Sequence, residues 1–104
     1  MEITINHLLG ALSEPTRLRA LEMLWDGDEH CVCELVERLG VTQSRMSRHL
    51  GRLKSAGLLV EGRDAQWVRY RRRPDIPGDR VAIIDAVLAA LPPFAAAQRQ
   101  QEAA

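Results

Sequence analysis

Two cysteines, Cys31 and Cys33, are the residues of this 104-residue sequence whose type and spacing are best suited to chemistry. They are the only cysteines in the chain, and a single valine separates them. Thiolates are soft ligands for soft metal ions and metalloids, and two neighbouring thiols can also be oxidised to a disulfide. The pair therefore predicts a soft-ion site or a redox site. The remaining alternative is that the two cysteines are small buried residues with a purely structural role.

Length and composition indicate one small globular domain, because 46% of the residues are hydrophobic and the chain has 104 residues. No run of about 18 apolar residues is present, so we expect no membrane span. The N-terminal residues lack a basic segment followed by a long apolar one, so we expect no signal peptide. We therefore expect a soluble cytoplasmic protein, whose thiols are ligands or sensors rather than a structural disulfide.

Charge is unevenly distributed along the chain although the formal net charge is zero. Residues 42–73 hold nine Lys and Arg against two acidic side chains, a net charge of +7, whereas residues 1–41 carry −5 and residues 74–104 carry −2. A contiguous basic segment in an otherwise acidic chain is typical of a face that binds a polyanion such as nucleic acid. The alternative is an ordinary solvated charged surface.

Apolar spacing and turn residues predict a mainly α chain, with four helices, a basic hairpin and one last helix. The expected helices cover residues 3–12, 13–25, 32–39, 42–56 and 79–91, and the expected strands cover 58–62 and 67–72. Ser13 and Thr42 are predicted helix N-caps, and Gly40 is predicted to end the third helix. We expect one domain over residues 1–92 and a frayed tail over residues 93–104.

The third and fourth helices, joined by a short turn at residues 39–41, have the spacing of a helix-turn-helix. In the fourth helix Met46, Leu50 and Leu53 share one face, while the opposite face carries small hydroxyl residues, arginines and a glycine. Such a face suits a helix in the DNA major groove, and the basic hairpin that follows it is typical of a wing. The alternative is an amphipathic helix with an ordinary solvated face.

Eight residues are candidates for DNA binding on this hypothesis. They are Gln43, Ser44, Arg45, Ser47, Arg48 and Arg52 on the helix, with Arg69 and Arg71 on the hairpin. The first two lie in the first turn, where recognition helices usually contact bases, while Arg48, Arg52 and also Lys54 suit phosphate contacts. On the wing, Arg72 and Arg73 could lie along the DNA backbone or in the minor groove together with Arg69 and Arg71. We expect Trp67 and Tyr70 to pack the hairpin onto the helices, and His49 to be a semi-buried histidine rather than a ligand.

Four short segments carry a resemblance to a known family: SEPTRL from Ser13, CVCEL from Cys31, SRHL from Ser47 and AGLL from Ala56. Over about residues 8–73 the chain resembles the ArsR-type (ArsR/SmtB) metalloregulatory repressors, in their arsenic-responsive branch. The resemblance implies a winged helix-turn-helix homodimer, with the first and last helices at the interface. It also implies binding to double-stranded operator DNA with an inverted repeat until an inducer releases the protein. The apolar face of the last helix, at Val81, Ile84, Leu88 and Leu91, is consistent with a partner surface and equally with packing inside the same chain.

The arsenic-responsive branch typically has a third cysteine three residues after Cys-Val-Cys, where this chain has Val36. The resemblance implies trivalent arsenic or antimony as inducer, with Cys31 and Cys33 as the binding residues and no obligatory cofactor. A hydroxide, a free thiol or His30 would then complete the site. Cadmium, lead, zinc or thiol oxidation remain alternative signals for the same repressor fold.

Helical geometry suggests how binding could become a signal. Residues i and i+2 of an α-helix point about 200° apart, so we expect ligation to unwind the start of the 32–39 helix and misplace Ser44 and Arg48.

A thiol redox enzyme is disfavoured, because no βαβ pattern surrounds the cysteines, and we expect no enzyme. A module that binds only proteins is disfavoured by the basic segment. The last helix has Asp79 and Asp85 but no histidine, which disfavours a harder metal site there.

Overall fold

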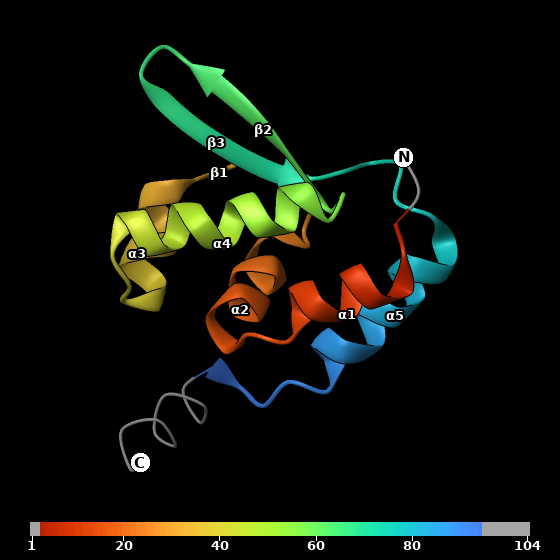
Figure 1. Cartoon of the computed structure of the whole chain (residues 1–104). Helices are drawn as coiled ribbons and strands as arrows, with labels where there is room; N and C mark the ends of the chain where they lie inside the picture. Colours follow the sequence, from red (N-terminus) through yellow and green to blue (C-terminus); the bar gives the residue numbers. More distant parts are fainter. Residues whose placement is uncertain (1–2, 95–104) are drawn as a thin grey trace.

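The computed structural model describes residues 3–94, which form five helices and a three-stranded antiparallel sheet (Figure 1). The elements are α1 (Ile5–Leu12), α2 (Pro15–Leu24), β1 (His30–Cys31), α3 (Val32–Leu39), α4 (Gln43–Ser55), β2 (Leu59–Asp64), β3 (Trp67–Arg72) and α5 (Gly78–Ala89). No helix among residues 3–94 has the length and apolar character needed to cross a membrane. The predicted winged helix-turn-helix order is confirmed, with one additional strand.

The additional strand is β1, which pairs with β3 and gives the sheet order β1-β3-β2. His30 lies opposite Tyr70 and Cys31 lies opposite Arg69. The sequence did not predict this strand, because two residues are too few to show an alternating pattern. The pairing attaches the first cysteine directly to the hairpin.

The N-cap of α2 is Glu14 rather than the predicted Ser13. The Glu14 Oε2 atom accepts a hydrogen bond of 2.7 Å from the backbone N–H of Arg17, while Ser13 ends α1 and its Oγ donates to the Gly10 carbonyl at 2.8 Å. Pro15 explains the difference, because proline is favoured at the first helical position and the residue before it then becomes the cap.

The turn of the helix-turn-helix forms as predicted. Gly40 ends α3 in the left-handed conformation with φ of 68°, and its N–H donates to the Val36 carbonyl at 2.9 Å. Thr42 caps α4 by accepting a hydrogen bond of 3.2 Å from the N–H of Arg45. These two residues set the direction in which α4 leaves α3.

Gly40→Ala is expected to lower the free energy of unfolding by about 1–2 kcal/mol, because a Cβ disfavours the left-handed backbone. No heavy atom lies within 4 Å of the position of that Cβ, so the cost comes from the backbone alone. Gly40→Asn is the control, since asparagine adopts this conformation more readily. Urea unfolding followed by circular dichroism measures both, and equal stability of the alanine variant and wild type would contradict the argument.

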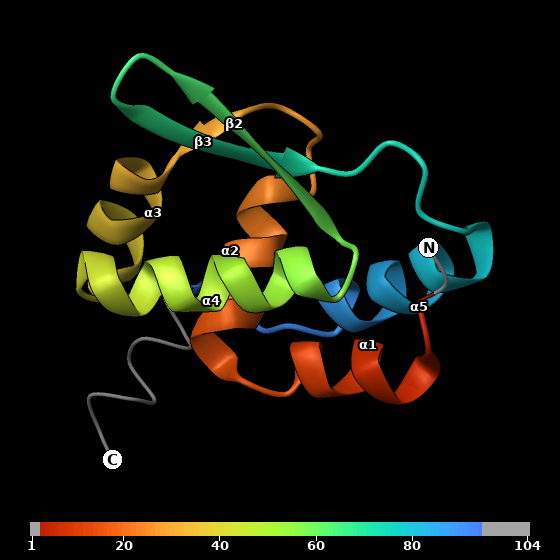
Figure 2. The same cartoon turned by 45° about the horizontal axis from the view of Figure 1, so that its top comes forward.

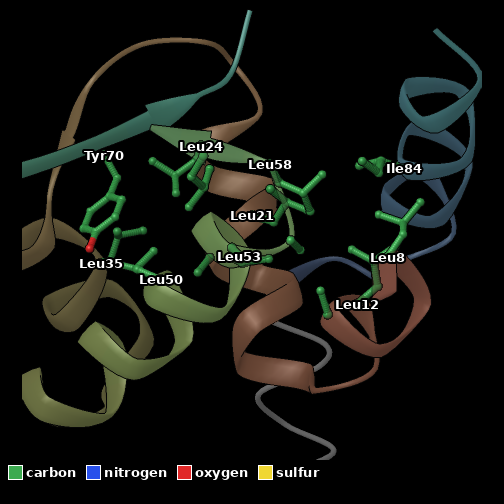
Figure 3. Packing of buried hydrophobic residues seen from close by; sticks show 14 of the residues in the cluster. Leu8, Leu12, Leu21, Leu24, Leu35, Leu50, Leu53, Leu58, Tyr70 and Ile84 are labelled. Atoms are coloured by element: carbon green, nitrogen blue, oxygen red, sulfur yellow. The ribbon is translucent and has the colours of Figure 1, made fainter. Parts of the chain in front are cut away.

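The core is built mainly from leucines of all four N-terminal helices and the hairpin, and Figure 3 shows Leu21, Leu50 and Leu53 in this interior. Met46, Leu50 and Leu53 are fully buried, as predicted. Burial of this stripe turns the opposite face of α4 outward.

The last helix contributes to the same core. Ile84 of α5 is fully buried and lies near Leu8 (Figure 3), so at this position the apolar face packs within the chain, one of the two alternatives that the sequence left open. Within the predicted tail, Phe94 lies under the guanidinium groups of Arg19 and Arg38, at 5.8 and 5.4 Å from its ring centre. Residues 95–104 of that predicted tail lie outside the described residues.

Candidate nucleic-acid interface and thiol pair

The outward face of α4 carries the residues predicted for DNA binding. All six of them are exposed to solvent: Gln43, Ser44, Arg45, Ser47, Arg48 and Arg52. The hairpin lies over the same side of the helix bundle as α4 (Figures 1 and 2), and there Arg71 is exposed and Arg69 half-buried. Both elements therefore carry solvent-accessible basic residues on neighbouring parts of the fold.

The predicted arginines are also electrostatically available. Within residues 3–94, no ion pair to a carboxylate is formed by Arg45, Arg48, Arg52, Arg69 or Arg71. Lys54 and Arg73, which the sequence also offered as DNA contacts, instead pair with carboxylates: Lys54 binds Glu61 at 3.0 Å and Arg73 binds Asp75 at 2.9 Å. Five of the predicted arginines therefore have no carboxylate partner among residues 3–94, whereas two other predicted cations do.

The aromatic residues near the wing have different roles. Tyr70 is buried and its hydroxyl donates to Glu61 at 3.4 Å, as expected for a residue that packs the hairpin onto the helices. Trp67 is 51% exposed, so the same expectation was wrong for it. It begins β3 beside the hairpin turn, which extends beyond the helices (Figure 1).

Arg72 attaches the base of the wing to the helices, so its guanidinium is not free to bind DNA. Its guanidinium lies 3.7 Å from the ring centre of Trp25 and donates to the Trp25 carbonyl at 3.4 Å. The indole Nε1 of Trp25 in turn donates to Asp85 of α5 at 2.6 Å. The sequence indicated none of these contacts, because their partners lie 47 and 60 residues apart.

The two cysteines meet at the start of α3, where they form a disulfide. Cys31 is the N-cap, with an extended backbone, and its Sγ accepts a hydrogen bond of 3.2 Å from the N–H of Cys33. Glu34 completes the cap by accepting from the N–H of Cys31 at 3.2 Å. The predicted unwinding of α3 is not needed to bring the sulfurs together, because only Cys33 lies inside the helix.

His30 is held between two carboxylates beside this pair. Its Nδ1 lies 3.1 Å from Glu34 and its Nε2 lies 3.1 Å from Asp26. Burial of the ring opposes protonation, but the hydrogen bonds with Glu34 and Asp26 outweigh it and raise the pKa of His30 above its ordinary value. Each ring nitrogen is engaged by a carboxylate, so His30 would have to leave one of these contacts before it could ligate an ion.

A cavity of about 530 Å³ adjoins the cysteines. Its lining residues come from the end of β1, from α3 and α4, and from the hairpin: Cys31, Val32, Cys33, Val36, Glu37, Gln43, Ser47, Glu61, Arg63, Gln66, Trp67, Val68 and Tyr70. The thiol pair thus shares one space with the first turns of α4 and with the wing. Sequence reasoning did not find this cavity, because it arises from the way the hairpin packs over α3.

A second group of polar residues links the α1–α2 turn to α4. Arg17 is 8% exposed, and its Nε donates to the Ala11 carbonyl at 2.6 Å while its Nη1 lies 3.4 Å from His49 Nδ1. The His49 Nε2 lies 3.5 Å from Glu14, so the predicted semi-buried histidine is confirmed. The buried arginine was not predicted, since charged residues are rarely buried without partners.

The pKa of His49 is lowered by burial and by the nearby Arg17, Arg45 and Arg48, against the opposing effect of Glu14. The unfolded chain therefore takes up a proton more readily than the folded one as pH falls below about 6.5. We therefore expect lowering the pH from 7.5 to 5.5 to change the free energy of unfolding less favourably in wild type than in His49→Gln. Urea unfolding at pH 7.5 and 5.5 tests this, since His30 is common to both proteins. An equal change in the free energy of unfolding in the two proteins would contradict this prediction.

Comparison with known proteins places this geometry in a family. The sequence pattern described as "Bacterial regulatory protein, arsR family" matches residues 14–60. The arsenical resistance operon repressor of Escherichia coli is 40% identical over 78 residues, which cover 75% of this chain and 67% of that protein. The chain belongs to the ArsR family. Its members are transcription regulators rather than enzymes, in agreement with the sequence prediction.

Further relatives support the same assignment. The arsenic resistance transcriptional regulator ArsR2 of Pseudomonas putida is 43% identical over 75 residues, covering 72% of this chain and 65% of that protein. This ArsR-family chain spans about half to two thirds of the length of the first curated relatives that it matches.

Solved structures share the fold. Reduced HlyU from Vibrio cholerae has a TM-score of 0.67 and 35% identity, over 79% of this chain and 82% of that one. The homodimeric winged helix-turn-helix DNA-binding domain Mb0332 from Mycobacterium bovis has a TM-score of 0.67 and 26% identity. The match covers 82% of this chain and 75% of that one.

Proposed function

We propose that this ArsR-family chain is a DNA-binding transcriptional repressor that leaves its operator when arsenite or antimonite binds Cys31 and Cys33. The observation that carries the proposal is the shared cavity, in which the cysteine pair adjoins Gln43 and Ser47 of the exposed face of α4. Relatives named as arsenic resistance regulators support the choice of inducer.

The DNA-bound form that we propose is a homodimer on an inverted repeat. Ile5 and Leu9 of α1 are 39% and 50% exposed, which is unusual for large apolar side chains and suits a partner surface. α1 lies beside α5 (Figures 1 and 2), so the two helices can form one interface. A two-fold dimer would present two copies of α4 to successive major grooves, and a related homodimeric domain supports this arrangement.

Arsenite reacts with the reduced pair by exchange of ligands. As(OH)₃ and two thiols give a dithiolate As–OH and two water molecules, with no change in oxidation state, and a free thiol could replace the remaining hydroxide. Bound arsenic would alter the contacts among α3, the start of α4 and the hairpin. Release follows if the inducer binds the DNA-incompetent arrangement more tightly than the DNA-bound one.

Thiol oxidation is a second candidate signal, which the disulfide between Cys31 and Cys33 favours. Two thiols would lose two electrons and two protons to an oxidant such as hydrogen peroxide, which becomes two water molecules. Cadmium, lead and zinc are further soft or borderline ions that the reduced pair could bind.

The test is a titration of the full chain, reduced with a phosphine, on a fluorescent duplex selected from a random-sequence pool. We expect fluorescence anisotropy to show DNA binding that weakens with salt, and release by arsenite and antimonite at lower concentrations than by cadmium, lead or zinc. Absent or salt-insensitive binding would overturn the repressor function. Release by peroxide alone would replace the metalloid signal with the oxidative one.

A further inference from the structure

We propose that the cavity beside the cysteines makes this chain selective for trivalent arsenicals that carry one carbon substituent. The two sulfurs would hold the arsenic and the cavity would hold the substituent. This inference rests on the proposed function of the cysteine pair and specifies the class of ligand that the pair binds.

The number of available thiols leads to this class. Trivalent arsenic forms three bonds, and the chain has two cysteines. A compound R–As(OH)₂ reacts with two thiols to give R–As bound to both sulfurs and two water molecules, without oxidation or reduction. Its carbon substituent already occupies the third position, so no third protein thiol is required. Arsenite on the same pair instead keeps a hydroxide or recruits a small thiol.

The wall of the cavity near the sulfurs suits a carbon substituent better than a hydroxide. Val36 lies one turn after Cys33 on the same face of α3, and Val32 lies between the two cysteines. Both valines line the cavity, so the third position faces apolar side chains where the resemblance places a cysteine. A methyl or phenyl group in that position would gain apolar contact with the two valines, which a hydroxide would not.

The hairpin supplies the opposite wall. Val68 lies opposite Arg63 and Tyr70 lies opposite Glu61 in the β2–β3 register, and all four line the cavity. Cross-strand partners share a face of the sheet, so one face of the hairpin covers this space. The volume of about 530 Å³ lies within the range of small-molecule sites.

The position of the cavity connects its occupant with DNA binding. Gln43 and Ser47 of α4 line it together with the hairpin residues, so a substituent would share one space with both elements proposed to bind DNA. An inducer that fills this space should therefore release DNA at a lower concentration than one that contacts only the sulfurs.

The experiment compares arsenite with phenylarsine oxide on the reduced full chain bound to its selected duplex, in wild type, Val36→Phe and Val68→Phe. We expect phenylarsine oxide to release wild type at a concentration at least about tenfold below that of arsenite. We expect each phenylalanine to reduce this ratio about tenfold by filling the cavity while leaving the arsenite response within about twofold. Any dithiol has an intrinsic preference for aryl arsenicals over arsenite. This preference is the same in wild type and in the variants, so it cancels when their ratios of the two release concentrations are compared.

Val36→Cys is the complementary variant, because it adds a third thiol one turn after Cys33. We expect it to lower the concentration of arsenite needed for release about tenfold and to leave phenylarsine oxide nearly unchanged. Circular dichroism checks that the variants fold, and two independent cavity positions protect the test if one does not. An unchanged ratio in the folded phenylalanine variants overturns the selectivity. Failure of both arsenicals to release wild type overturns the proposed function itself.

Discussion

Cys33→Ser is expected to bind operator DNA within about twofold of wild type and to lose its release by arsenite. Cys33 is exposed at the start of α3 and its side chain is not part of the core, so serine should not disturb the fold. The hydroxyl that replaces the thiol is a poor ligand for a soft metalloid, and a single remaining thiolate cannot chelate it. Anisotropy titration of the reduced proteins on the same duplex measures both properties.

Substitutions of Cys31 can separate its role in the response to arsenite from its role as the N-cap of α3. Its Sγ caps α3, and serine is a better N-cap than cysteine, so Cys31→Ser should lose the response while keeping or increasing stability. Cys31→Ala is the matched control, which loses the response and about 1 kcal/mol of stability with the cap. A Cys31→Ser protein that arsenite still releases would exclude the pair as the inducer site.

The helices and the wing could be predicted from sequence because their signals are local. Gly40 and Thr42 act on neighbouring residues, and the stripe of Met46, Leu50 and Leu53 decides which face of α4 is buried. The outward arginines follow directly from that stripe. Their exposure was therefore predictable, although their contacts with DNA remain predictions.

The parts that sequence reasoning missed depend on contacts between distant segments. The pairing of Cys31 with Arg69 has no local signal, and neither does the attachment of Arg72 to Trp25. The geometry of the cysteines was misjudged for a related reason. The 200° argument holds only if both residues are helical, and the pairing of β1 with β3 keeps Cys31 extended in front of the helix. The cavity beside the pair exists because the hairpin covers α3 there.

Arg48→Ala is expected to weaken operator binding about tenfold or more in low salt and to flatten its salt dependence. The Arg48 side chain is exposed and forms no ion pair among the described residues, so its charge is available to a phosphate. Each phosphate contact contributes about 0.9 to the slope of log affinity against log salt, so a two-fold dimer should lose about two units. Anisotropy titrations at several salt concentrations give the slope.

Lys54→Ala is the matched control for this prediction, because it removes one positive charge from the same helix. The Lys54 ammonium already binds Glu61 at 3.0 Å, and surface pairs of this kind contribute at most about 1 kcal/mol to stability. We therefore expect Lys54→Ala to change DNA affinity and the salt slope much less than Arg48→Ala. Equal losses in the two variants would show that total charge, rather than the outward face of α4, governs binding. An unchanged slope in Arg48→Ala would remove this arginine from the interface.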